Sequence, residues 1–519
     1  TPAQVFNGAV NVPTNASNLA TACALCSHNC GLRVDVADNK IVEVRADDDH
    51  PSTKGYSCNK AYAIANYVNH AQRVTQPLKK LADGSFKAIS WDTAISEIAE
   101  KLNHIRKNHA PRSIAFAGLG GQGNHSSGLA AIPLMYGIGT PMVFTALAQE
   151  KTQHWLNDRR MIRGTNDIYL TADKHHAKFM CTGYEKWEFS IFPKDIIAPQ
   201  VRPPVVNPMG QALPEVEIYY RLARAMGLVG AAPKFLHRLA KQARKPLMTP
   251  AYLAAVNSYA LASSKLQGVG AIVARSAFLM YETLGKTLPN PMLAYIWLLT
   301  LGYASTRRDQ VIRALSEAKA MLNPFALTEY LFAKILANPQ GVLLGHYEIE
   351  HNFEYYSKHQ DGKIRLYFAD YAQDLSRLIA QDVEPDEKDY PFVLNGGLRT
   401  GFTANTIMRD PSWRKGRAIH ASLYMSEADA AALNAKEGDL VKISSKRSSV
   451  IAPVKVDKNT LTGHLHLPNI LGQYYPDSVT GELKANGIAI NELVDLTDRD
   501  PYTGCPHTKR IRCKVELVN

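Results

Sequence analysis

The chain has 519 residues, of which 46% are hydrophobic, and this length suits a globular enzyme of about three or four domains. Lysine and arginine number 59 against 47 acidic residues, which gives a formal net charge of +12. The basic residues are spread along the sequence without a dense block of interleaved aromatics, which argues against a nucleic-acid-binding protein. A basic surface, or ligands that carry phosphate, would account for the excess.

The most apolar segment is too short to cross a membrane. Residues 291–304, PMLAYIWLLTLGYA, fall below the ~20 residues that span a bilayer and include a proline. We therefore predict a buried helix there and a protein that does not itself span the membrane. The sequence starts at Thr1 without a basic leader, so we expect a cytoplasmic location, while a cleaved leader and a periplasmic location stay open.

Four of the seven cysteines lie within the first 58 residues, which indicates a metal site rather than a disulfide scaffold. Cys23, Cys26 and Cys30 form a C-x2-C-x3-C motif, and Cys58 follows 28 positions later. Residues 31–51 alternate apolar and polar on both sides of ADNK, which predicts a β-hairpin that returns the chain to its starting point.

Four converging thiolates suit two kinds of metal site. A [4Fe-4S] cluster takes one thiolate for each iron, and a structural zinc ion takes four in a tetrahedron. Zinc ribbons usually pair one C-x2-C motif with another, so the spacing favours the cluster. Lys60, two residues after Cys58, would then place a cation beside the cluster, or would be an ordinary surface lysine.

The next segment predicts an α/β domain. Residues 90–109 read as a helix with caps at Ser90 and Asp92. Isoleucine and leucine recur on one helical face, at Ile95, Ile98, Leu102 and Ile105. Residues 113–118, SIAFAG, read as a short buried strand that leads into glycines.

The glycines of residues 118–123, GLGGQG, match the pattern of a dinucleotide-binding loop. The acidic residue expected about 20 positions later is missing, since residues 137–147 contain none, and this argues against NAD. The bare amides of Gly120 and Gly121 would still suit a phosphate or a pterin edge, or simply a tight turn.

The remaining elements change character along the chain. Residues 214–227 are the clearest helix, and the following hundred residues look mostly helical. Residues 382–391, DVEPDEKDYP, read as a linker. Beyond it PFVL, DLVKISS, VIAPVKV and GHLHLP read as strands, and a short helix begins at Ser426 with a capping box to Asp429. This mixture predicts a barrel-like C-terminal domain.

Two blocks of sequence resemble the molybdopterin oxidoreductase family of the dimethyl-sulfoxide-reductase type. The first, residues 22–160, contains CALCSHNC, GYSCNKA and ALAQEKTQHWLNDRR, and the second contains DGKIRLYFADYAQDLSRL, LNGGLRTGFTANTIMRDPSWRKG and DLTDRDPYTGCPHTKR. The resemblance implies molybdenum or tungsten held by a bis(molybdopterin guanine dinucleotide), with a [4Fe-4S] cluster.

The implied fold is multidomain α/β. It comprises a β-rich iron-sulfur domain (1–62), an α/β domain with Rossmann-like character (63–164), a mostly helical middle region (165–381) and a double-psi-like C-terminal β-barrel (390–519). At residues 163–165 the sequence passes to a segment that resembles a much later part of the family, so either the middle region is shortened relative to the family or the sequence given omits a segment of the protein. This departure bears on the binding of one of the two dinucleotides.

The resemblance also implies roles for individual residues. Cys23, Cys26, Cys30 and Cys58 would ligate the cluster, and Lys60 would lie between it and the nearer pterin. Contacts with the pterins and their phosphates are implied for Gly397, Arg399, Thr400, Asn405, Asn469, Asn491, Arg499, Asp500 and Lys509.

The stretch that supplies a metal ligand in many family members corresponds to FTALAQEKTQHW, which contains no cysteine or serine. Glu150 could ligate the metal, and Lys151 and His154 could face it as charged or proton-carrying groups, or all three could only hold loops in place.

The predicted function is an oxidoreductase that carries out a two-electron oxygen-atom or hydride transfer on a small molecule. Electrons would pass through the cluster to an iron-sulfur, flavin or cytochrome subunit. Two alternatives keep the same fold: a non-catalytic electron-relay or structural subunit that has lost the metal, and a non-redox hydratase in which the metal is a Lewis acid.

Overall fold

The computed structural model of the chain describes most of its residues, in two compact units. The described residues are 12–25, 30–117, 125–144, 152–153, 156–157, 159–162, 188–190, 196–197, 199–263, 269–321, 323–346, 358–380, 388–398, 410–414, 421–468, 471–477 and 480–518. Unit 1 comprises Thr1–Ala146 and Thr171–Glu348, and unit 2 comprises Leu147–Leu170 and Ile349–Asn519.

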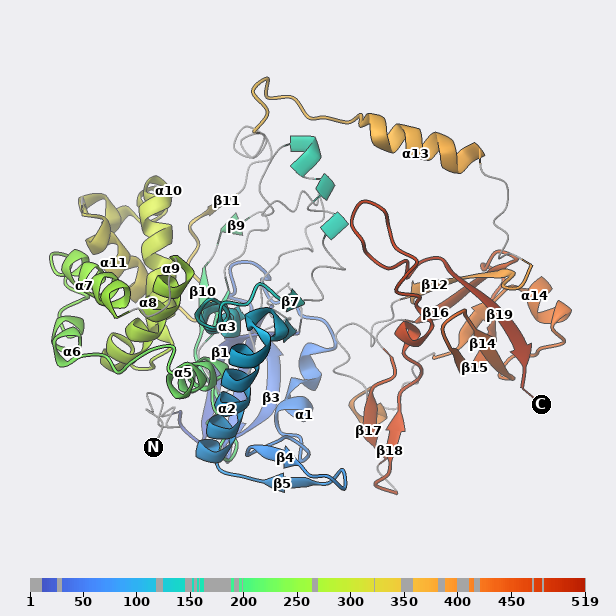
Figure 1. Cartoon of the computed structure of the whole chain (residues 1–519), viewed down its shortest axis with the longest axis horizontal. Helices are drawn as coiled ribbons and strands as arrows, with labels where there is room; N and C mark the ends of the chain where they lie inside the picture. Colours follow the sequence, from blue (N-terminus) through green and yellow to red (C-terminus); the bar gives the residue numbers. More distant parts are fainter. Residues whose placement is uncertain are drawn as a thin grey trace. The chain divides into compact units, whose positions relative to one another are not determined.

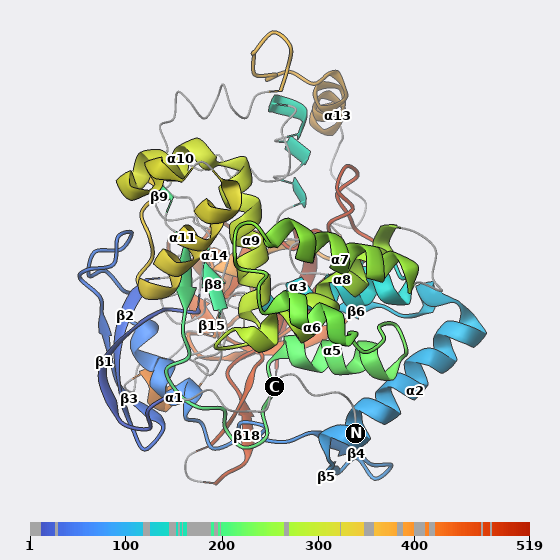
Figure 2. The ribbon, with the colours of Figure 1, turned by 90° about the vertical axis from the view of Figure 1, so that its left-hand side faces the viewer.

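Unit 1 begins with a three-stranded antiparallel sheet in chain order. Its strands are β1 (Ala16–Ala22), β2 (Gly31–Ala37) and β3 (Lys40–Ala46). The predicted hairpin is confirmed: β2 and β3 are joined by Asp38 and Asn39, whose φ angles of 48° and 59° are those of a type I′ turn. The short helix α1 (Ile64–Val68) packs against β3 (Figure 2).

The predicted α/β segment follows. Helix α2 (Trp91–His109) begins at Ser90, whose hydroxyl accepts the Thr93 N–H at 3.1 Å, so the predicted cap is confirmed. Strands β6 (Phe116–Ala117) and β7 (Val143–Phe144) pair in parallel, and helix α3 (His125–Ile138) lies between them in the sequence. A strand, a helix and a parallel strand in succession form the βαβ unit of Rossmann-like domains.

Two predictions in this segment are wrong in detail. Ile98 is 45% exposed, because α2 turns Ala94, Ile95 and Ala99 to the core instead. The strand covers Phe116–Ala117 alone, and its residues are half-buried and exposed rather than buried.

A helical region supplies most of one extended hydrophobic core of unit 1, and Figure 1 shows its helices lying together. Its helices are α5 (Glu215–Ala225), α6 (Lys234–Ala240), α7 (Thr249–Ala262), α8 (Val269–Thr283), α9 (Leu293–Thr306), α10 (Arg308–Ala314) and α11 (Pro324–Ala337), with 3-10 turns η3 (Gly285–Thr287) and η4 (Ser316–Ala320). The predictions of a helix at 214–227 and of a buried helix at 291–304 are confirmed by α5 and by α9, in which Trp297 is 1% exposed.

Small elements complete unit 1. They are the 3-10 helices η1 (Ala61–Ala63) and η2 (Pro111–Ser113), and the strands β4 (Leu78–Lys80), β5 (Phe86–Ala88), β8 (Glu188–Ser190), β9 (Ile196–Ile197), β10 (Gln200–Arg202) and β11 (Gly345–His346). The strands pair as β4 with β5, β10 with β8 and β11 with β9, each antiparallel.

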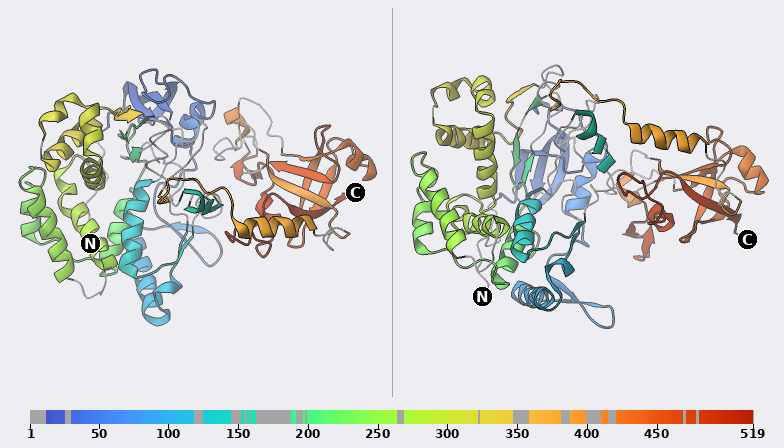
Figure 3. Two further views of the ribbon diagram at one scale, coloured as in Figure 1. Left: turned by 90° about the horizontal axis from the view of Figure 1, so that it is seen from above. Right: turned by 45° about the horizontal axis from the view of Figure 1, so that its top comes forward.

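Unit 2 is built around a closed barrel, as the sequence predicts (Figure 3). The barrel strands are β12 (Phe392–Leu398), β13 (Leu423–Met425), β14 (Leu440–Ser444), β15 (Ser449–Val456), β16 (His464–Pro468) and β19 (Ile511–Leu517). Their order around the barrel is β12-β16-β13-β15-β14-β19. Strands β12 and β16 pair in parallel, as do β13 and β15, so the chain crosses the barrel between neighbours.

Shorter elements complete unit 2. They are α13 (Ala369–Ala380), α14 (Glu427–Ala432), the 3-10 helices η6 (Pro411–Arg414) and η7 (Ile490–Leu493), and the hairpin of β17 (Tyr474–Pro476) and β18 (Leu483–Ala485). The predicted cap of α14 at Ser426 is confirmed, because Ser426 Oγ accepts the Asp429 N–H at 3.1 Å. The Asp429 carboxylate accepts the Ser426 hydroxyl at 2.7 Å. None of the described helices combines the length and the apolar composition needed to cross a bilayer.

Candidate cofactor-binding sites

Cys23 and Cys30 lie opposite each other just beyond the paired ends of β1 and β2. Ala22 and Gly31 form the last pair of the β1–β2 ladder, and the Cys23 N–H donates to the Cys30 carbonyl at 2.8 Å, which extends the ladder by one residue. Cys23 and Cys30 are 3% and 4% exposed. The loop that joins them contains Cys26, which lies outside the described residues.

A set of buried hydrogen bonds returns the chain from β3 to the cysteine hairpin. The Asp47 N–H donates to the Gly31 carbonyl at 3.0 Å, and the Gly55 N–H donates to the Asp47 carbonyl at 3.0 Å. The Gly31 N–H donates to the hydroxyl of Thr53 at 3.0 Å. Residues 47–55 are thereby fixed alongside the residue that follows Cys30, only a few positions before Cys58.

The packing around Gly31 is too tight for a side chain. A β-carbon at Gly31 would overlap the side chain of His50, which is 4% exposed. The Thr53 hydroxyl and the Thr53 N–H lie 3.0 Å and 3.1 Å from His50 Nδ1. Arg33 Nε lies 3.0 Å from Asp47 Oδ1, and the Asp47 side chain is 2% exposed. This buried polar network gives the 47–55 segment one conformation relative to Cys30.

Three of the four predicted cluster ligands lie among the described residues: Cys23 and Cys30 are buried, and Cys58 is partly exposed. Cysteine thiolates are the donors that an iron-sulfur cluster needs. Within the described ranges, which omit Cys26, no group of three or more His, Cys, Asp or Glu side chains is arranged to hold a metal ion, so Cys58 is not gathered with Cys23 and Cys30 into one site. Lys60 is half-buried, and precedes η1, where its carbonyl accepts the Ala63 N–H at 3.1 Å.

The barrel brings together two of the residues to which the resemblance assigns cofactor contacts. Gly397, in β12, has φ of +143°, and a β-carbon there would overlap the ammonium group of Lys509. The neighbouring Gly396 N–H donates to the Thr508 carbonyl at 3.0 Å, which holds the two segments side by side. A lysine ammonium over a bare glycine backbone is a suitable contact for a phosphate.

Two other predicted residues, Arg499 and Asp500, make their described contacts within their own loop. The Asp500 carboxylate accepts the Thr503 N–H at 2.7 Å, the Thr503 hydroxyl at 2.6 Å and the Tyr502 N–H at 3.2 Å. Burial alone would raise the pKa of Asp500, but these hydrogen bonds outweigh it and lower the pKa. Arg499 is exposed and donates to the Leu496 carbonyl.

Asn491, another predicted residue, lies on η7, outside the loop that contains Arg499 and Asp500. It is exposed, and its carbonyl accepts from Arg447 Nη1 at 2.9 Å. The remaining predicted residues lie outside the described part of the chain, and these are Cys26, Gly120, Gly121, Glu150, Lys151, His154, Arg399, Thr400, Asn405 and Asn469.

The sequence interpretation missed an anchor around Arg160, six residues after His154. The Arg160 guanidinium donates to both oxygens of Asp370 at 2.7 Å and stacks on the rings of Phe368 and Tyr371, 4.6 Å and 4.2 Å from their centroids. The Tyr371 ring in turn packs edge-on against Tyr502 at 4.5 Å. The hydrogen bond from Arg160 lowers the pKa of Asp370, so the carboxylate stays charged beside the guanidinium at physiological pH.

Arg160 lies just after the segment that contains Glu150 and His154. Through Tyr371, which packs on Tyr502, the anchor connects the end of that segment to the loop that contains Asp500. The residues of the anchor lie in both blocks of sequence that resemble the family: NDRR in the first, and FADYAQD and DPYTG in the second. A basic residue in one block and alternating aromatic and acidic residues in the other were the available signals, but sequence alone does not pair them.

Three protein-family models match the chain in the order of these sites. Residues 18–70 match the molybdopterin oxidoreductase Fe4S4 domain, residues 73–159 match molybdopterin oxidoreductase, and residues 392–512 match the molydopterin dinucleotide binding domain. The first contains the cysteine hairpin and Lys60, and the third contains the barrel with Gly397 and Lys509.

Among the individual proteins similar to the chain are a reductase subunit and a protein of solved structure. The thiosulfate reductase molybdopterin-containing subunit PhsA of Salmonella typhimurium is 33% identical over 126 residues, which is 24% of this chain and 16% of that subunit's length. The solved structure of acetylene hydratase from Pelobacter acetylenicus aligns with a TM-score of 0.48 at 13% identity, over 96% of this chain and 100% of that one.

The family models identify the cofactors as a [4Fe-4S] cluster and molybdenum or tungsten in a bis(molybdopterin guanine dinucleotide). The buried cysteine hairpin and the contact between Gly397 and Lys509 are compatible with these groups. The chain therefore belongs to the molybdopterin oxidoreductase family.

Proposed function

We propose that the chain is the catalytic part of an oxidoreductase that transfers an oxygen atom or a hydride to or from a small molecule. The observation that carries the proposal is the buried connection of Cys23, Cys30 and the segment before Cys58, on the same chain as a dinucleotide-binding barrel. When bound, the metal supplies the two-electron chemistry and the cluster accepts or donates electrons singly.

The protein's own residues would hold these groups in fixed positions. Cys23, Cys26, Cys30 and Cys58 would ligate the cluster, and Lys60 would place a positive charge between the cluster and the nearer pterin. In the barrel, Lys509 would neutralise a phosphate or a pterin oxygen above Gly397. The parallel pairing of β12 with β16 and of β13 with β15 supports a double-psi arrangement for this barrel.

The segment of Glu150, Lys151 and His154 is the proposed source of groups that face the metal. The anchor of Arg160 on Asp370, Phe368 and Tyr371 supports this role, because it would restrain the end of that segment. A carboxylate or an imidazole in such a place could hold or release the proton that accompanies an electron transfer. The electrons would leave through an iron-sulfur, flavin or cytochrome partner.

The proposal is tested by separating the two cofactors with cysteine variants of the anaerobically purified holoprotein. Cys58→Ser should lower the iron content and the rate with an artificial electron acceptor, while molybdenum or tungsten is retained. Cys513→Ala is the matched control, because Cys513 is fully buried in the barrel core, outside the predicted cluster site. Full activity of Cys58→Ser with the acceptor would contradict the relay.

The same assay distinguishes the alternatives. Turnover of a substrate without any electron acceptor would identify a non-redox hydratase. Iron without molybdenum or tungsten in the native protein would identify an electron-relay or structural subunit.

A further inference from the structure

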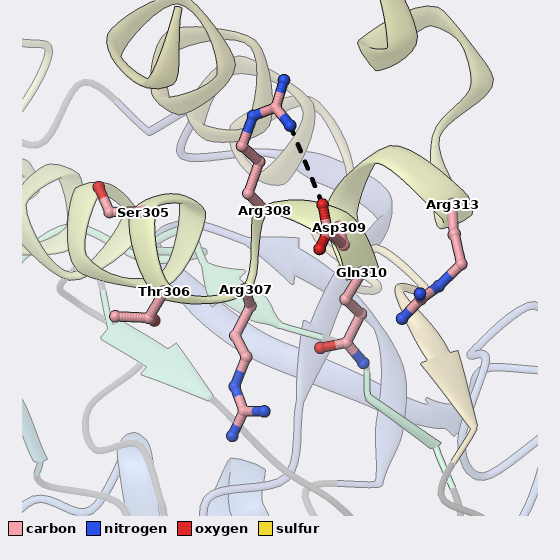
Figure 4. Close-up of a pocket in the computed structure, with 7 residues that line it drawn as sticks. All are labelled: Ser305, Thr306, Arg307, Arg308, Asp309, Gln310 and Arg313. Atoms are coloured by element: carbon pink, nitrogen blue, oxygen red, sulfur yellow. Dashed lines mark ion pairs between the residues drawn. The ribbon is translucent and has the colours of Figure 1, made fainter. Parts of the chain in front are cut away.

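A polar cavity lies in unit 1 at the junction of α9 and α10, in a region that the family models leave unmatched. Its volume is about 470 Å³, and it is lined by consecutive residues from Ser305 to Gln310 together with Arg313. Figure 4 shows this lining, which includes the arginines Arg307, Arg308 and Arg313 and a single carboxylate, that of Asp309.

The break between the helices determines the directions of these side chains. Helix α9 ends at Thr306, and Arg307 leaves the helical conformation with φ of −122° and ψ of 29°. The Arg307 carbonyl accepts the N–H groups of Gln310 and Val311 at 3.0 Å and 3.1 Å, which starts α10 in a fixed orientation. The side chains of Arg307, Gln310 and Arg313 extend to one side of the chain, and that of Arg308 extends to the other (Figure 4).

The amide of Gln310 is oriented as a hydrogen-bond donor toward this side. The Tyr303 hydroxyl donates to Gln310 Oε1 at 3.0 Å, so the amide nitrogen faces the opposite direction. Burial raises the pKa of Tyr303 to about 12, which keeps the phenol protonated and able to donate. The Gln310 amide is therefore fixed before any ligand binds.

The single carboxylate of the lining lies on the side of Arg308, away from the other two arginines. Asp309 is 84% exposed, and its carboxylate lies 3.9 Å from Arg308 Nη1, on the side away from Arg307 and Arg313. Among the seven lining residues, the side of Arg307, Gln310 and Arg313 carries donors and positive charge without a carboxylate. Guanidinium groups match the oxygens of a phosphate in pairs and stay charged at all physiological pH values.

We propose that this cavity binds the phosphate group of a small phosphorylated molecule, held by Arg307, Arg313 and the Gln310 amide. A volume of about 470 Å³ lies in the range of small-molecule sites, about 300–1,000 Å³, and exceeds by far the ~30 Å³ that one water molecule takes in the liquid. The cavity thus has room for more than a bare phosphate ion.

The test is isothermal titration of the anaerobic holoprotein with inorganic phosphate, adenosine monophosphate and adenosine. We expect both phosphates to bind and adenosine not to bind. Binding of adenosine monophosphate should tighten between about pH 5.5 and about pH 7.5 as the second proton of its phosphate ester, with a pKa of about 6, is lost. Equal binding of adenosine and its monophosphate, or no heat with either phosphate up to about 10 mM, would overturn the proposal.

Variants assign the binding to one side of the cavity. Arg307→Gln and Arg313→Gln should each weaken phosphate binding at least about tenfold, equivalent to about 1.4 kcal/mol. Arg308→Gln is the matched control, since it removes the same charge from the other side and should change affinity less than about twofold. Gln310→Glu, which places a carboxylate among the donors, should abolish binding.

The thermal midpoint of each variant shows whether it is folded. Equal losses in Arg308→Gln and Arg313→Gln would show that general surface charge, and not this cavity, attracts the anion, and would overturn the proposal. A folded Gln310→Glu variant that binds phosphate normally would do the same.

Discussion

The hydrogen bond between the Thr53 hydroxyl and the Gly31 N–H offers a direct test of how the predicted cluster segment is held. Thr53 is 8% exposed, and its hydroxyl accepts the buried Gly31 N–H at 3.0 Å and lies 3.0 Å from His50 Nδ1. Thr53→Val keeps the shape of the side chain but removes the acceptor. The Gly31 N–H then has no partner in its place, and an unsatisfied buried donor costs about 1–3 kcal/mol.

This cost is expected to appear as local opening of the segment that delivers Cys58. A loss of about 1–3 kcal/mol lowers the protection of the Gly31 amide from hydrogen exchange by about 5-fold to 150-fold. Iron should also leave the holoprotein faster when a ferrous chelator is present, because Cys58 is held less firmly relative to Cys30. Both effects are measured on the purified holoprotein, by exchange with mass spectrometry and by the absorbance of the chelate.

Thr53→Ser is the control, since it keeps the hydroxyl and loses only a methyl group. The serine variant should retain most of the protection and the iron of the natural protein. If Thr53→Val and Thr53→Ser exchange and release iron at the same rate, the hydrogen bond to Gly31 does not hold the cluster segment, and the reasoning is refuted.

Three further predictions concern other parts of the chain. Glu217→Gln should lower the free energy of unfolding of unit 1, measured in urea, by about 3–5 kcal/mol. The reason is that Arg221 Nε and Glu217 Oε1 form a buried ion pair at 2.7 Å, and the substitution removes the negative charge of that pair. A loss below about 1 kcal/mol, as expected for an exposed ion pair, would contradict this. Gly397→Ala should lower the ratio of molybdenum or tungsten to iron, because its β-carbon meets Lys509, whereas Gly463→Ala, with a positive φ but open space, should not; equal ratios in the two variants would exclude the role of the contact. Burial raises the pKa of the Cys513 thiol to about 12, so its contribution to stability is complete below about pH 9 and is lost between about pH 9 and about pH 12. Cys513→Ala should remove that part of the alkaline loss, and an unchanged pH profile would speak against it.

Local sequence signals were sufficient where neighbouring residues determine the structure. The β2–β3 turn follows from Asp38 and Asn39, which tolerate the left-handed conformation, and the start of α2 follows from the hydroxyl of Ser90. The buried helix α9 follows from an apolar run around Trp297. The face of α2 did not follow from its spacing, since the packing of unit 1 left Ile98 exposed.

Contacts between distant residues could not be read from the sequence. The approach of Lys509 to Gly397 depends on the closure of the barrel, in which β12 pairs with β16 and with β19. The stacking of Arg160 on the rings of Phe368 and Tyr371 joins residues about two hundred positions apart. Residue type and order indicated which segments matter, but tertiary packing decides which of their side chains meet.

The most direct test of the account is elemental analysis of anaerobically purified native protein for iron, molybdenum, tungsten and zinc, with absorption spectra before and after dithionite. We expect about four irons and about one molybdenum or tungsten per chain, and visible absorption that bleaches on reduction. Zinc alone, in a colourless protein, would contradict the cluster at Cys23, Cys26, Cys30 and Cys58 and the proposed redox function with it.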